Sequence, residues 1–262
     1  MIDATANIHP STIIEDGAKI GKNVSIGAFT HIGANVEIGD NNKIASHVVI
    51  EGHTKIGSGN HIFQFASIGA EPQSIAYHGE PTRVEIGDDN ILREYVTINR
   101  GTPDDRGLTN IGDNNFLMAY VHIAHDCSLG SNIVFANCAS LAGHVHVEDY
   151  VIMGGFSLVH QFCRVGAHCI TGIGSVCIQD VPPYTLAAGN KAITHGINVK
   201  GLRRRDFSST DISELKKAYK IIYRSGFTTK TAIEEVRKLE WTSEHIEHLT
   251  AYFDNSKRGV IR

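Results

Sequence analysis

Residues 20–40, IGKNVSIGAFTHIGANVEIGD, decide the fold, because isoleucine recurs there at 20, 26, 32 and 38 and glycine follows each time. Extended in both directions, the six-residue spacing holds at every step from Ile2 to Ile68. An α-helix repeats every ~3.6 residues, so these side chains would spread around its surface instead of forming a stripe. Short strands separated by turns fit better, with each isoleucine pointing inward and each glycine giving the turn backbone freedom. The stretch therefore predicts a β-helix whose coils stack on one continuous core.

The same spacing continues through most of the chain. It returns at Ile86 and Ile98, and it resumes one residue out of phase from Ile111 to Val165. An ordinary β-sandwich is the alternative, but its strands are longer and less regular than this spacing allows. We therefore expect an all-β, parallel β-helix.

Two segments interrupt the repeat, residues 70–83 and residues 100–109. Together they are rich in Pro, Gly, Asp and Arg, so we expect them to form loops that leave the β-helix. Loops on a rigid scaffold often carry binding residues, although an insertion that is merely tolerated explains the same pattern.

The repeat ends at about residue 185, and a helical pattern follows. Helices are expected in three segments, residues 208–226, 228–240 and 243–253. The first begins with a capping-box sequence, in which Ser208 is followed three residues later by Asp211. We divide the chain into a β-helix of residues 1–187 and a C-terminal α-helical domain of residues 188–262.

Composition limits the class of protein. A net charge of −4 argues against a nucleic-acid-binding protein, which needs a basic surface to displace counterions. No apolar run approaches the roughly 18 residues of a membrane span, and the N-terminal MIDATANIHP has no signal-peptide pattern. The five cysteines are an odd set without a CxxC pair, which favours free thiols in a reducing compartment. We expect a cytoplasmic protein.

The histidines point to a possible site. If three hexapeptides make one coil, residues 18 positions apart lie above one another. Of the 15 histidines, four then fall near one edge of three successive coils, namely His122, His125, His144 and His160. A lone histidine is usually only a surface residue, whereas four at one edge indicate function.

Two kinds of chemistry suit such a cluster. Three neutral imidazoles are enough to hold a catalytic zinc ion, as in the gamma-class carbonic anhydrases, which are zinc lyases on a trimeric β-helix. Alternatively, one histidine acts as a general base, because its pKa lies near neutrality. Asp126 follows His125 directly and could fix its tautomer if the two side chains meet at a turn, since consecutive strand residues point to opposite faces.

Longer stretches resemble one family of enzymes. They are HIAHDC (122–127), LAGHV (141–145), VHQFC (159–163), QDVPPY (179–184), QFASIG (64–69), GEPTRVEIGD (79–88) and RGVIR (258–262). Together they are similar to the UDP-N-acetylglucosamine acyltransferases (the LpxA family) of the hexapeptide-repeat superfamily, which begin lipid A synthesis. The resemblance implies a left-handed β-helix and a homotrimer with each site between two chains.

The resemblance also implies a reaction and roles for residues. A 3-hydroxyacyl chain passes from the thioester of acyl carrier protein to the glucosamine 3-position of the UDP-sugar. No cofactor is expected, because the chain arrives on the phosphopantetheine of the carrier protein, and no metal is expected. His125 would be the general base, Asp126 would orient it, and the N–H of Gly143 would stabilise the oxyanion.

Other residues would bind the substrates. The resemblance places the following in the sugar and acyl groove: Gln73, His122, His144, His160 and Gln161. In the basic run NVKGLRRRD (198–206), Asn198 and Arg204 would contact the UDP moiety, and Arg205 would attract the acidic carrier protein. Read alone, this run is also explained as a solvated charged turn. Ile173 would close the far end of the groove and favour shorter acyl chains.

The sequence departs from the family pattern at four positions, Ser74, Ala76, Asn99 and Lys200. Many relatives have aspartate, lysine, histidine and glutamate at these places. The departures leave open whether the acceptor is a hydroxyl or the amine of a 3-amino UDP-sugar. A zinc lyase and a non-catalytic β-helix binding module are the alternatives from other classes.

Overall fold

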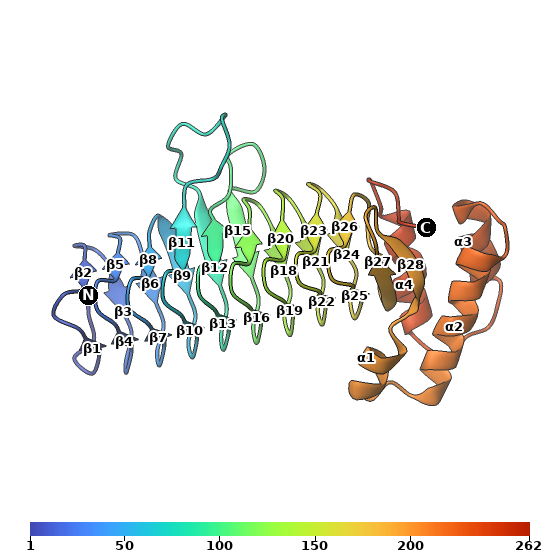
Figure 1. The fold of residues 1–262 in the computed structure, drawn as a ribbon, viewed down its shortest axis with the longest axis horizontal. Helices are drawn as coiled ribbons and strands as arrows, with labels where there is room; N and C mark the ends of the chain where they lie inside the picture. Colours follow the sequence, from blue (N-terminus) through green and yellow to red (C-terminus); the bar gives the residue numbers. More distant parts are fainter.

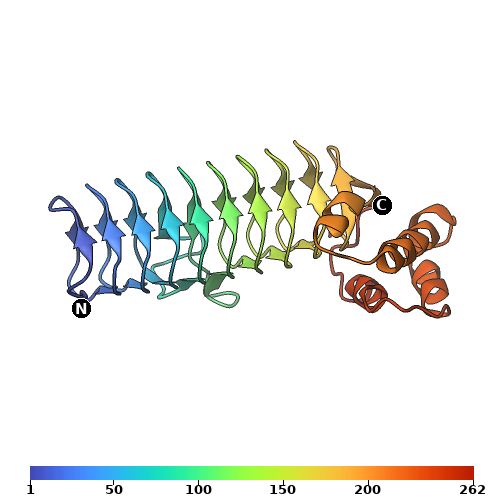
Figure 2. The ribbon, with the colours of Figure 1, turned by 90° about the horizontal axis from the view of Figure 1, so that it is seen from below.

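The computed structural model describes all 262 residues, and it confirms a left-handed parallel β-helix followed by a helical region (Figures 1 and 2). Each coil adds one short strand to each of three sheets, which have 11, 9 and 8 strands. Most neighbouring strands are parallel and pair residues 18 positions apart, for example Ile8 with Ile26 and Ile32 with Ile50. Three hexapeptides therefore make one coil, as the spacing predicted.

The strands have the following bounds. The 11-stranded sheet contains β1 (Asn7–Ile8), β4 (Ser25–Ile26), β7 (Lys43–Ile44), β10 (His61–Ile62), β13 (Ile91–Leu92), β16 (Phe116–Leu117), β19 (Val134–Phe135), β22 (Ile152–Met153), β25 (Ile170–Thr171), β27 (Thr185–Ala188) and β28 (Ile193–Ile197). The 9-stranded sheet contains β2 (Ile13–Ile14), β5 (His31–Ile32), β8 (Val49–Ile50), β11 (Ser67–Ala70), β14 (Thr97–Asn99), β17 (His122–Ile123), β20 (Ser140–Leu141), β23 (Leu158–Val159) and β26 (Val176–Cys177). The 8-stranded sheet contains β3 (Lys19–Ile20), β6 (Glu37–Ile38), β9 (His53–Ile56), β12 (Arg83–Ile86), β15 (Leu108–Ile111), β18 (Ser128–Leu129), β21 (His146–Val147) and β24 (Arg164–Val165).

The aliphatic residues of the repeat form the core. A single cluster of 42 buried residues runs along the β-helix, and Ile32, Ile50 and Ile68 within it are fully buried. Burying one such side chain contributes about 1.5–3 kcal/mol, so the repeated aliphatic residues are a major source of stabilisation. At the N-terminal end the core is open, and Ile2 is 48% exposed.

Glycine follows the isoleucines for a physical reason that differs from the expected one. Gly21 and Gly39 do not have positive φ angles, and the left-handed turn positions carry larger residues instead, such as Phe29 (φ 57°) and His47 (φ 58°). A Cβ on Gly39 would lie 2.7 Å from the carbonyl oxygen of Gly57 in the next coil. The close approach of neighbouring coils, and not turn flexibility, favours glycine at these places.

The two predicted loops leave the β-helix on the same side, where they project from β11 and toward β15 (Figure 1). They occupy residues 71–82 and 100–107. Across the first loop the coil-to-coil separation is 30 residues, an excess of 12 over the usual 18, and across the second it is 25, an excess of 7. Twelve is a multiple of six and seven is not, which explains why the repeat shifts phase only after the second loop.

The C-terminal region contains four helices, α1 (Val199–Arg204), α2 (Ser209–Arg224), α3 (Thr229–Arg237) and α4 (His245–Asp254). The last three confirm the three predicted helices, and Ser208 and Asp211 form the expected capping box. The short α1 was not predicted, because it lies in the basic run. The boundary drawn at residues 187 and 188 falls inside β27, whose antiparallel partner β28 extends the sheet into the C-terminal region.

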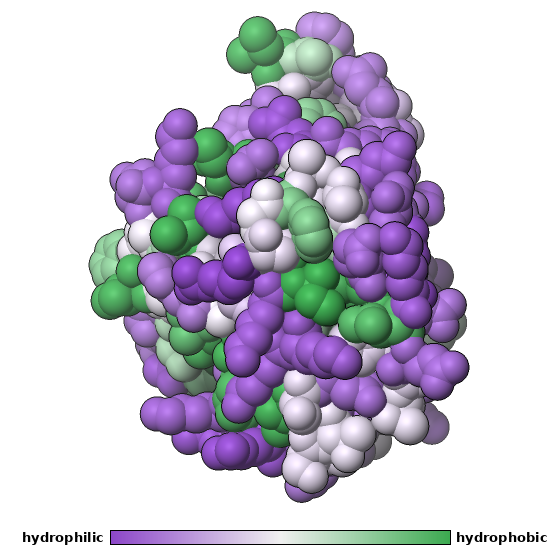
Figure 3. Space-filling model, turned by 90° about the vertical axis from the view of Figure 1, so that its right-hand side faces the viewer, coloured by the Kyte–Doolittle hydropathy of each residue, from purple (hydrophilic) through white to green (hydrophobic).

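Helices α2, α3 and α4 pack on one another beyond the end of the β-helix (Figure 2). The outer surface of this end is largely hydrophilic, with hydrophobic residues in small separate groups (Figure 3). No helix is both long and apolar enough to cross a membrane.

All five cysteines are free, and burial raises the pKa of Cys127 and of Cys177 to about 12.

We expect Gly69→Ala to destabilise the protein much more than Gly79→Ala. Both glycines have positive φ angles, at 81° and 98°, so each alanine costs about 1–2 kcal/mol of backbone strain. Only at Gly69 would the new Cβ also collide, 2.1 Å from the carbonyl oxygen of Glu51. Thermal unfolding followed by circular dichroism measures the difference, and equal midpoints for the two variants would contradict the proposed crowding.

Candidate active site

The site lies at the corner that follows β17, β20 and β23, where three successive turns lie above one another. The second residue of each turn has a left-handed backbone conformation, with φ angles of 58° at Asp126, 62° at His144 and 64° at Phe162. In this conformation neighbouring side chains no longer point to opposite faces as they do in a strand. The corner therefore brings together residues that come one after another in the chain and residues from successive coils.

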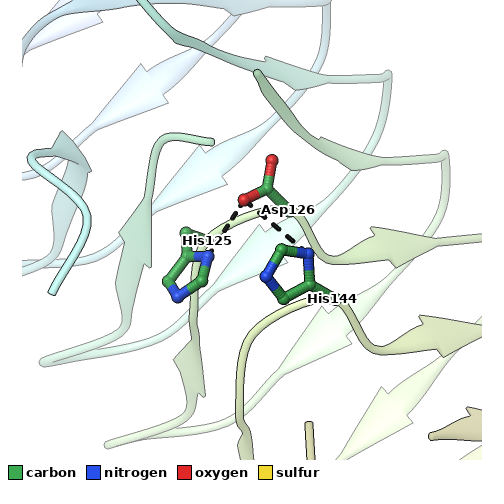
Figure 4. A group of neighbouring side chains, drawn as sticks. All are labelled: His125, Asp126 and His144. Carbon is green, nitrogen blue, oxygen red and sulfur yellow. Dashed lines mark hydrogen bonds and ion pairs between the residues drawn. The ribbon is translucent and has the colours of Figure 1, made fainter. Parts of the chain in front are cut away.

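His125 and Asp126 meet at the first of these turns (Figure 4). The distance from Nδ1 of His125 to Oδ2 of Asp126 is 2.9 Å. The carboxylate is completely buried, whereas the imidazole is 18% exposed. With the carboxylate accepting from Nδ1–H, Nε2 of His125 carries a lone pair that is free to take a proton.

The loop of residues 100–107 supplies the other partners of Asp126. The backbone N–H and the hydroxyl of Thr102 donate to Oδ2 at 2.9 and 2.6 Å. Burial alone raises the pKa of Asp126, but the hydrogen bonds from His125 and Thr102 and the nearby His144 outweigh it and lower the pKa. Asp126 is therefore a satisfied, ionised carboxylate in a buried place.

His144 lies beside this pair. Its Nδ1 is 2.6 Å from Oδ2 of Asp105, which belongs to the same loop, and 3.9 Å from Oδ2 of Asp126. The centroid of its ring lies 4.9 Å from that of the His125 ring, which it meets edge-on, and 4.3 Å from that of the Phe162 ring, on which it stacks. His144 is thus held by two coils and by the loop.

Gly143 completes the corner. A Cβ at this position would lie 2.5 Å from Cε1 and 2.7 Å from Nε2 of His125, so only glycine leaves room for the imidazole. The N–H of Gly143 donates no hydrogen bond within the chain. A proton acceptor and a free N–H donor consequently lie next to each other.

The other two histidines of the predicted cluster have separate partners. Nδ1 of His122 is 2.7 Å from the hydroxyl of Thr97, and burial together with the nearby His125 lowers the pKa of His122. His160 is exposed, and its Nδ1 is 2.9 Å from Nη2 of Arg258. The structure therefore joins His125 and His144 directly, keeps His122 nearby, and places His160 against the C-terminal segment.

The remaining predicted groove residues are exposed. Gln73 lies on the loop of residues 71–82 and lines a hollow that also includes Asn99 and Arg100. Gln161 occupies the same turn position as Gly143, one coil further on. Ile173 is 79% exposed. It lies in the turn before β26, at the corner where the strands of the 9-stranded sheet begin, whereas the site lies at the corner where they end.

The basic run surrounds α1. Asn198 is buried, where its Oδ1 accepts from the N–H of Gly201 and its Nδ2 donates to the carbonyl of His168 at 3.0 Å. Arg204 is exposed. Arg205 lies over the ring of Tyr150 at 5.0 Å, and its Nη1 is buried without an acceptor. Arg205 thus has unused hydrogen-bonding capacity at the junction of the β-helix and the helices.

Of the four departures from the family pattern, Asn99 has the clearest structural place. It is buried, and its Nδ2 donates to the carbonyl of Glu71 at 2.7 Å, which holds the base of the first loop. Ser74 lies half-buried within that loop, while Ala76 and Lys200 are exposed.

The group His125, Asp126 and His144 is also the place where a metal ion could be held, since its donor atoms lie within 4.8 Å of one another. Two features disfavour that use. Oδ2 of Asp126 already accepts three hydrogen bonds, two of them from Thr102, and the two histidines direct Nδ1 at carboxylates. The three-histidine set of a carbonic anhydrase is not assembled, because His122 and His160 are bound elsewhere.

Two residues of this site were missed by sequence reasoning, Thr102 and Asp105. The only signal was their position in a loop rich in polar residues that interrupts the repeat. Contacts across 24 and 39 residues depend on how that loop folds back over the corner, which spacing does not reveal.

We expect the stability of the wild type to fall more steeply on acidification than that of Asp126→Asn. Because the folded-state pKa of Asp126 is lowered, its stabilisation is present above the unfolded-state value of about 4 and is lost as the pH falls through the folded-state value. Thermal midpoints between about pH 2 and pH 6 measure this effect. Asp104→Asn, an exposed residue of the same loop, is the control, and parallel curves for wild type and Asp126→Asn would contradict the expectation.

Family models match both parts of the chain. Residues 17–52 and 108–143 match the bacterial transferase hexapeptide (six repeats), and residues 180–261 match domain 2 of Udp N-acetylglucosamine O-acyltransferase. The chain is 55% identical over 255 residues to the acyl-[acyl-carrier-protein]–UDP-N-acetylglucosamine O-acyltransferase of Alkalilimnicola ehrlichii, covering 97% of this chain and 99% of that protein. It is 53% identical over 259 residues to the enzyme of the same name from a Janthinobacterium species, with 97% and 99% covered.

Solved structures are similar over the same length. The UDP-N-acetylglucosamine acyltransferase of Bacteroides fragilis superposes with a TM-score of 0.91 at 43% identity, covering 100% of both chains. That of Campylobacter jejuni superposes with a TM-score of 0.93 at 39% identity, covering 97% of this chain and 99% of the other. The likeness therefore includes the β-helix and the C-terminal helices.

Proposed function

Since the chain belongs to the family of acyl-[acyl-carrier-protein]–UDP-N-acetylglucosamine O-acyltransferases, we propose that His125 is the general base of its acyl transfer. The acceptor is the hydroxyl at the glucosamine 3-position of the UDP-sugar, and the donor is a 3-hydroxyacyl thioester on acyl carrier protein. The observation that carries the proposal is the free Nε2 of His125 beside the free N–H of Gly143.

The reaction requires a proton to leave the acceptor and later to reach the leaving group. Nε2 of His125 takes the hydroxyl proton while the oxygen attacks the thioester carbonyl carbon, forming a C–O bond. The tetrahedral intermediate then breaks its C–S bond, and the departing thiolate receives the proton from the imidazolium. Asp126 holds the imidazole in one tautomer and stabilises its protonated form, and Thr102 keeps that carboxylate ionised.

The oxyanion of the intermediate needs a donor near the base. We assign this role to the N–H of Gly143, since a preorganised donor of this kind contributes about 3 kcal/mol to transition-state stabilisation. We take the acceptor to be a hydroxyl and not an amine, because the relatives are named as O-acyltransferases. Binding of the sugar and the acyl chain is assigned to exposed and half-buried residues around the corner, namely Gln73, His122, His144, His160 and Gln161.

The basic run suits the charged parts of both substrates. Arg204 and Arg205 offer planar donor sets that match a diphosphate, and Asn198 fixes the start of the helix that carries Arg204. The same positive charge attracts an acidic carrier protein at low salt. We further propose that the enzyme is a cytoplasmic homotrimer in which the neighbouring chain completes each site, and light scattering of the purified protein tests the trimer.

We expect His125→Ala to reduce acyl transfer by about 10²- to 10⁴-fold, because the imidazole that lies against Gly143 and is held by the buried carboxylate of Asp126 is that of His125. The measurement is product formation from UDP-N-acetylglucosamine and an acyl carrier protein thioester. His53→Ala on β9, an exposed histidine of a different sheet, is the control and keeps full activity. Activity of His125→Ala within a few-fold of wild type would rule out the assignment.

We expect Ile173→Gly to shift donor preference toward longer acyl chains. The bulky side chain at position 173 would close the groove that holds the chain, and glycine would open it. Competition between ten-carbon and fourteen-carbon donors gives the ratio of kcat/KM values for wild type and variant. Ile75→Gly, at a fully exposed isoleucine of the first loop, is the control. An unchanged ratio for Ile173→Gly would show that another residue measures the chain.

A further inference from the structure

The last residues of the chain return to the β-helix. Val260 forms a parallel bridge with Asp180, the N–H of Asp180 donates to the carbonyl of Gly259 at 2.9 Å, and the N–H of Ile261 donates to the carbonyl of Asp180 at 3.0 Å. Ile261 is 1% exposed and belongs to the core cluster of the β-helix. The C-terminal segment, residues 256–262, is therefore an integral part of the final coil and not a free tail.

This segment is fixed on both sides of Arg258. Before it, the hydroxyl of Ser256 donates to the buried carboxylate of Asp180 at 2.6 Å. After it, Arg262 donates through Nη2 to the carbonyl of Ile222 in α2 at 2.7 Å. Between these anchors the carbonyl of Arg258 accepts from Nε2 of Gln179 at 3.4 Å. The backbone that carries Arg258 is thus held in place by the fold on both sides.

Arg258 reaches one residue of the proposed substrate groove. Its Nη2 is 2.9 Å from Nδ1 of His160, across 98 residues of sequence. A guanidinium group has donors only, so this contact requires the lone pair of Nδ1. The carbonyl oxygen of Gln161 also lies 3.2 Å from Nδ1 and would require a proton on that nitrogen. Nδ1 makes only one hydrogen bond in the plane of the ring, and Arg258, which can only donate, is nearer at 2.9 Å. His160 is consequently held as the tautomer that carries its proton on Nε2.

We propose that Arg258 is a positioning residue for substrate binding, which fixes the ring of His160 and makes its Nε2–H a donor for an oxygen atom of the nucleotide sugar. The inference rests on the proposed function, because it needs His160 to contact the substrate. An exposed pair such as this contributes little to stability, so its effect belongs to binding. The C-terminal segment thereby acts on the groove without touching the substrate.

A double-mutant cycle tests the proposal with Arg258→Met, His160→Ala and the double variant. The loss of one oriented hydrogen bond raises KM for UDP-N-acetylglucosamine by about five- to tenfold in Arg258→Met, with kcat little changed. Because Arg258 acts through His160, the same substitution has no further effect in the His160→Ala background. Arg258→Lys restores part of the loss. Lys257→Met, a neighbouring exposed residue without a hydrogen bond in the structure, is the control and leaves KM unchanged.

The outcomes separate the two proposals. If His160→Ala leaves KM unchanged, the proposed role of His160 in the groove is wrong. If His160→Ala raises KM but Arg258→Met does not, the inference on Arg258 is wrong while the groove assignment stands. If the effects of Arg258→Met and His160→Ala multiply in the double variant, Arg258 acts independently of His160 and the inference is wrong. A lower thermal midpoint that accounts for the loss in Arg258→Met would also overturn it, by showing that the role of Arg258 is structural.

Discussion

The structure depends on one constraint, which is that each coil must place its inward aliphatic residues directly on those of the coil before. The pairing of Ile32 with Ile50, and of Ile123 with Leu141, fixes the rotation of every coil about the axis of the β-helix. Turns then lie above turns, and their side chains form columns along the corners. The contact of His125 with Gly143 and His144 is a consequence of this register, because a coil rotated by one residue would separate them.

The chemistry needs something that the regular repeat does not provide. A buried carboxylate without partners is costly and would take up a proton. Thr102 removes that cost for Asp126, and Asp105 does the corresponding work of holding His144. The second loop is therefore part of the site and not a tolerated insertion. Its seven additional residues break the six-residue phase, which a purely structural repeat would have no reason to do.

Much of the fold could be predicted from the sequence, because the spacing of isoleucine reports directly on burial. The pair His125 and Asp126 could also be predicted, since the coil count puts both at a corner. By contrast, Thr102 and Arg258 act across 24 and 98 residues through segments that carry no repeat. The role given to the glycines was wrong because spacing cannot distinguish turn flexibility from crowding between coils. Helix α1 was missed because its basic sequence is equally compatible with a solvated turn.

The two ends of the β-helix differ in a way that concerns its behaviour in concentrated solution. A stack of parallel strands can in principle be extended by another molecule at each exposed edge. At the C-terminal end the hairpin of β27 and β28 turns the last strand antiparallel, and Ile261 covers the core, so a further parallel coil has no template. At the N-terminal end only very short strands remain, β1 and β2, which offer few backbone groups. End-to-end growth into filaments is thereby blocked mainly at one terminus.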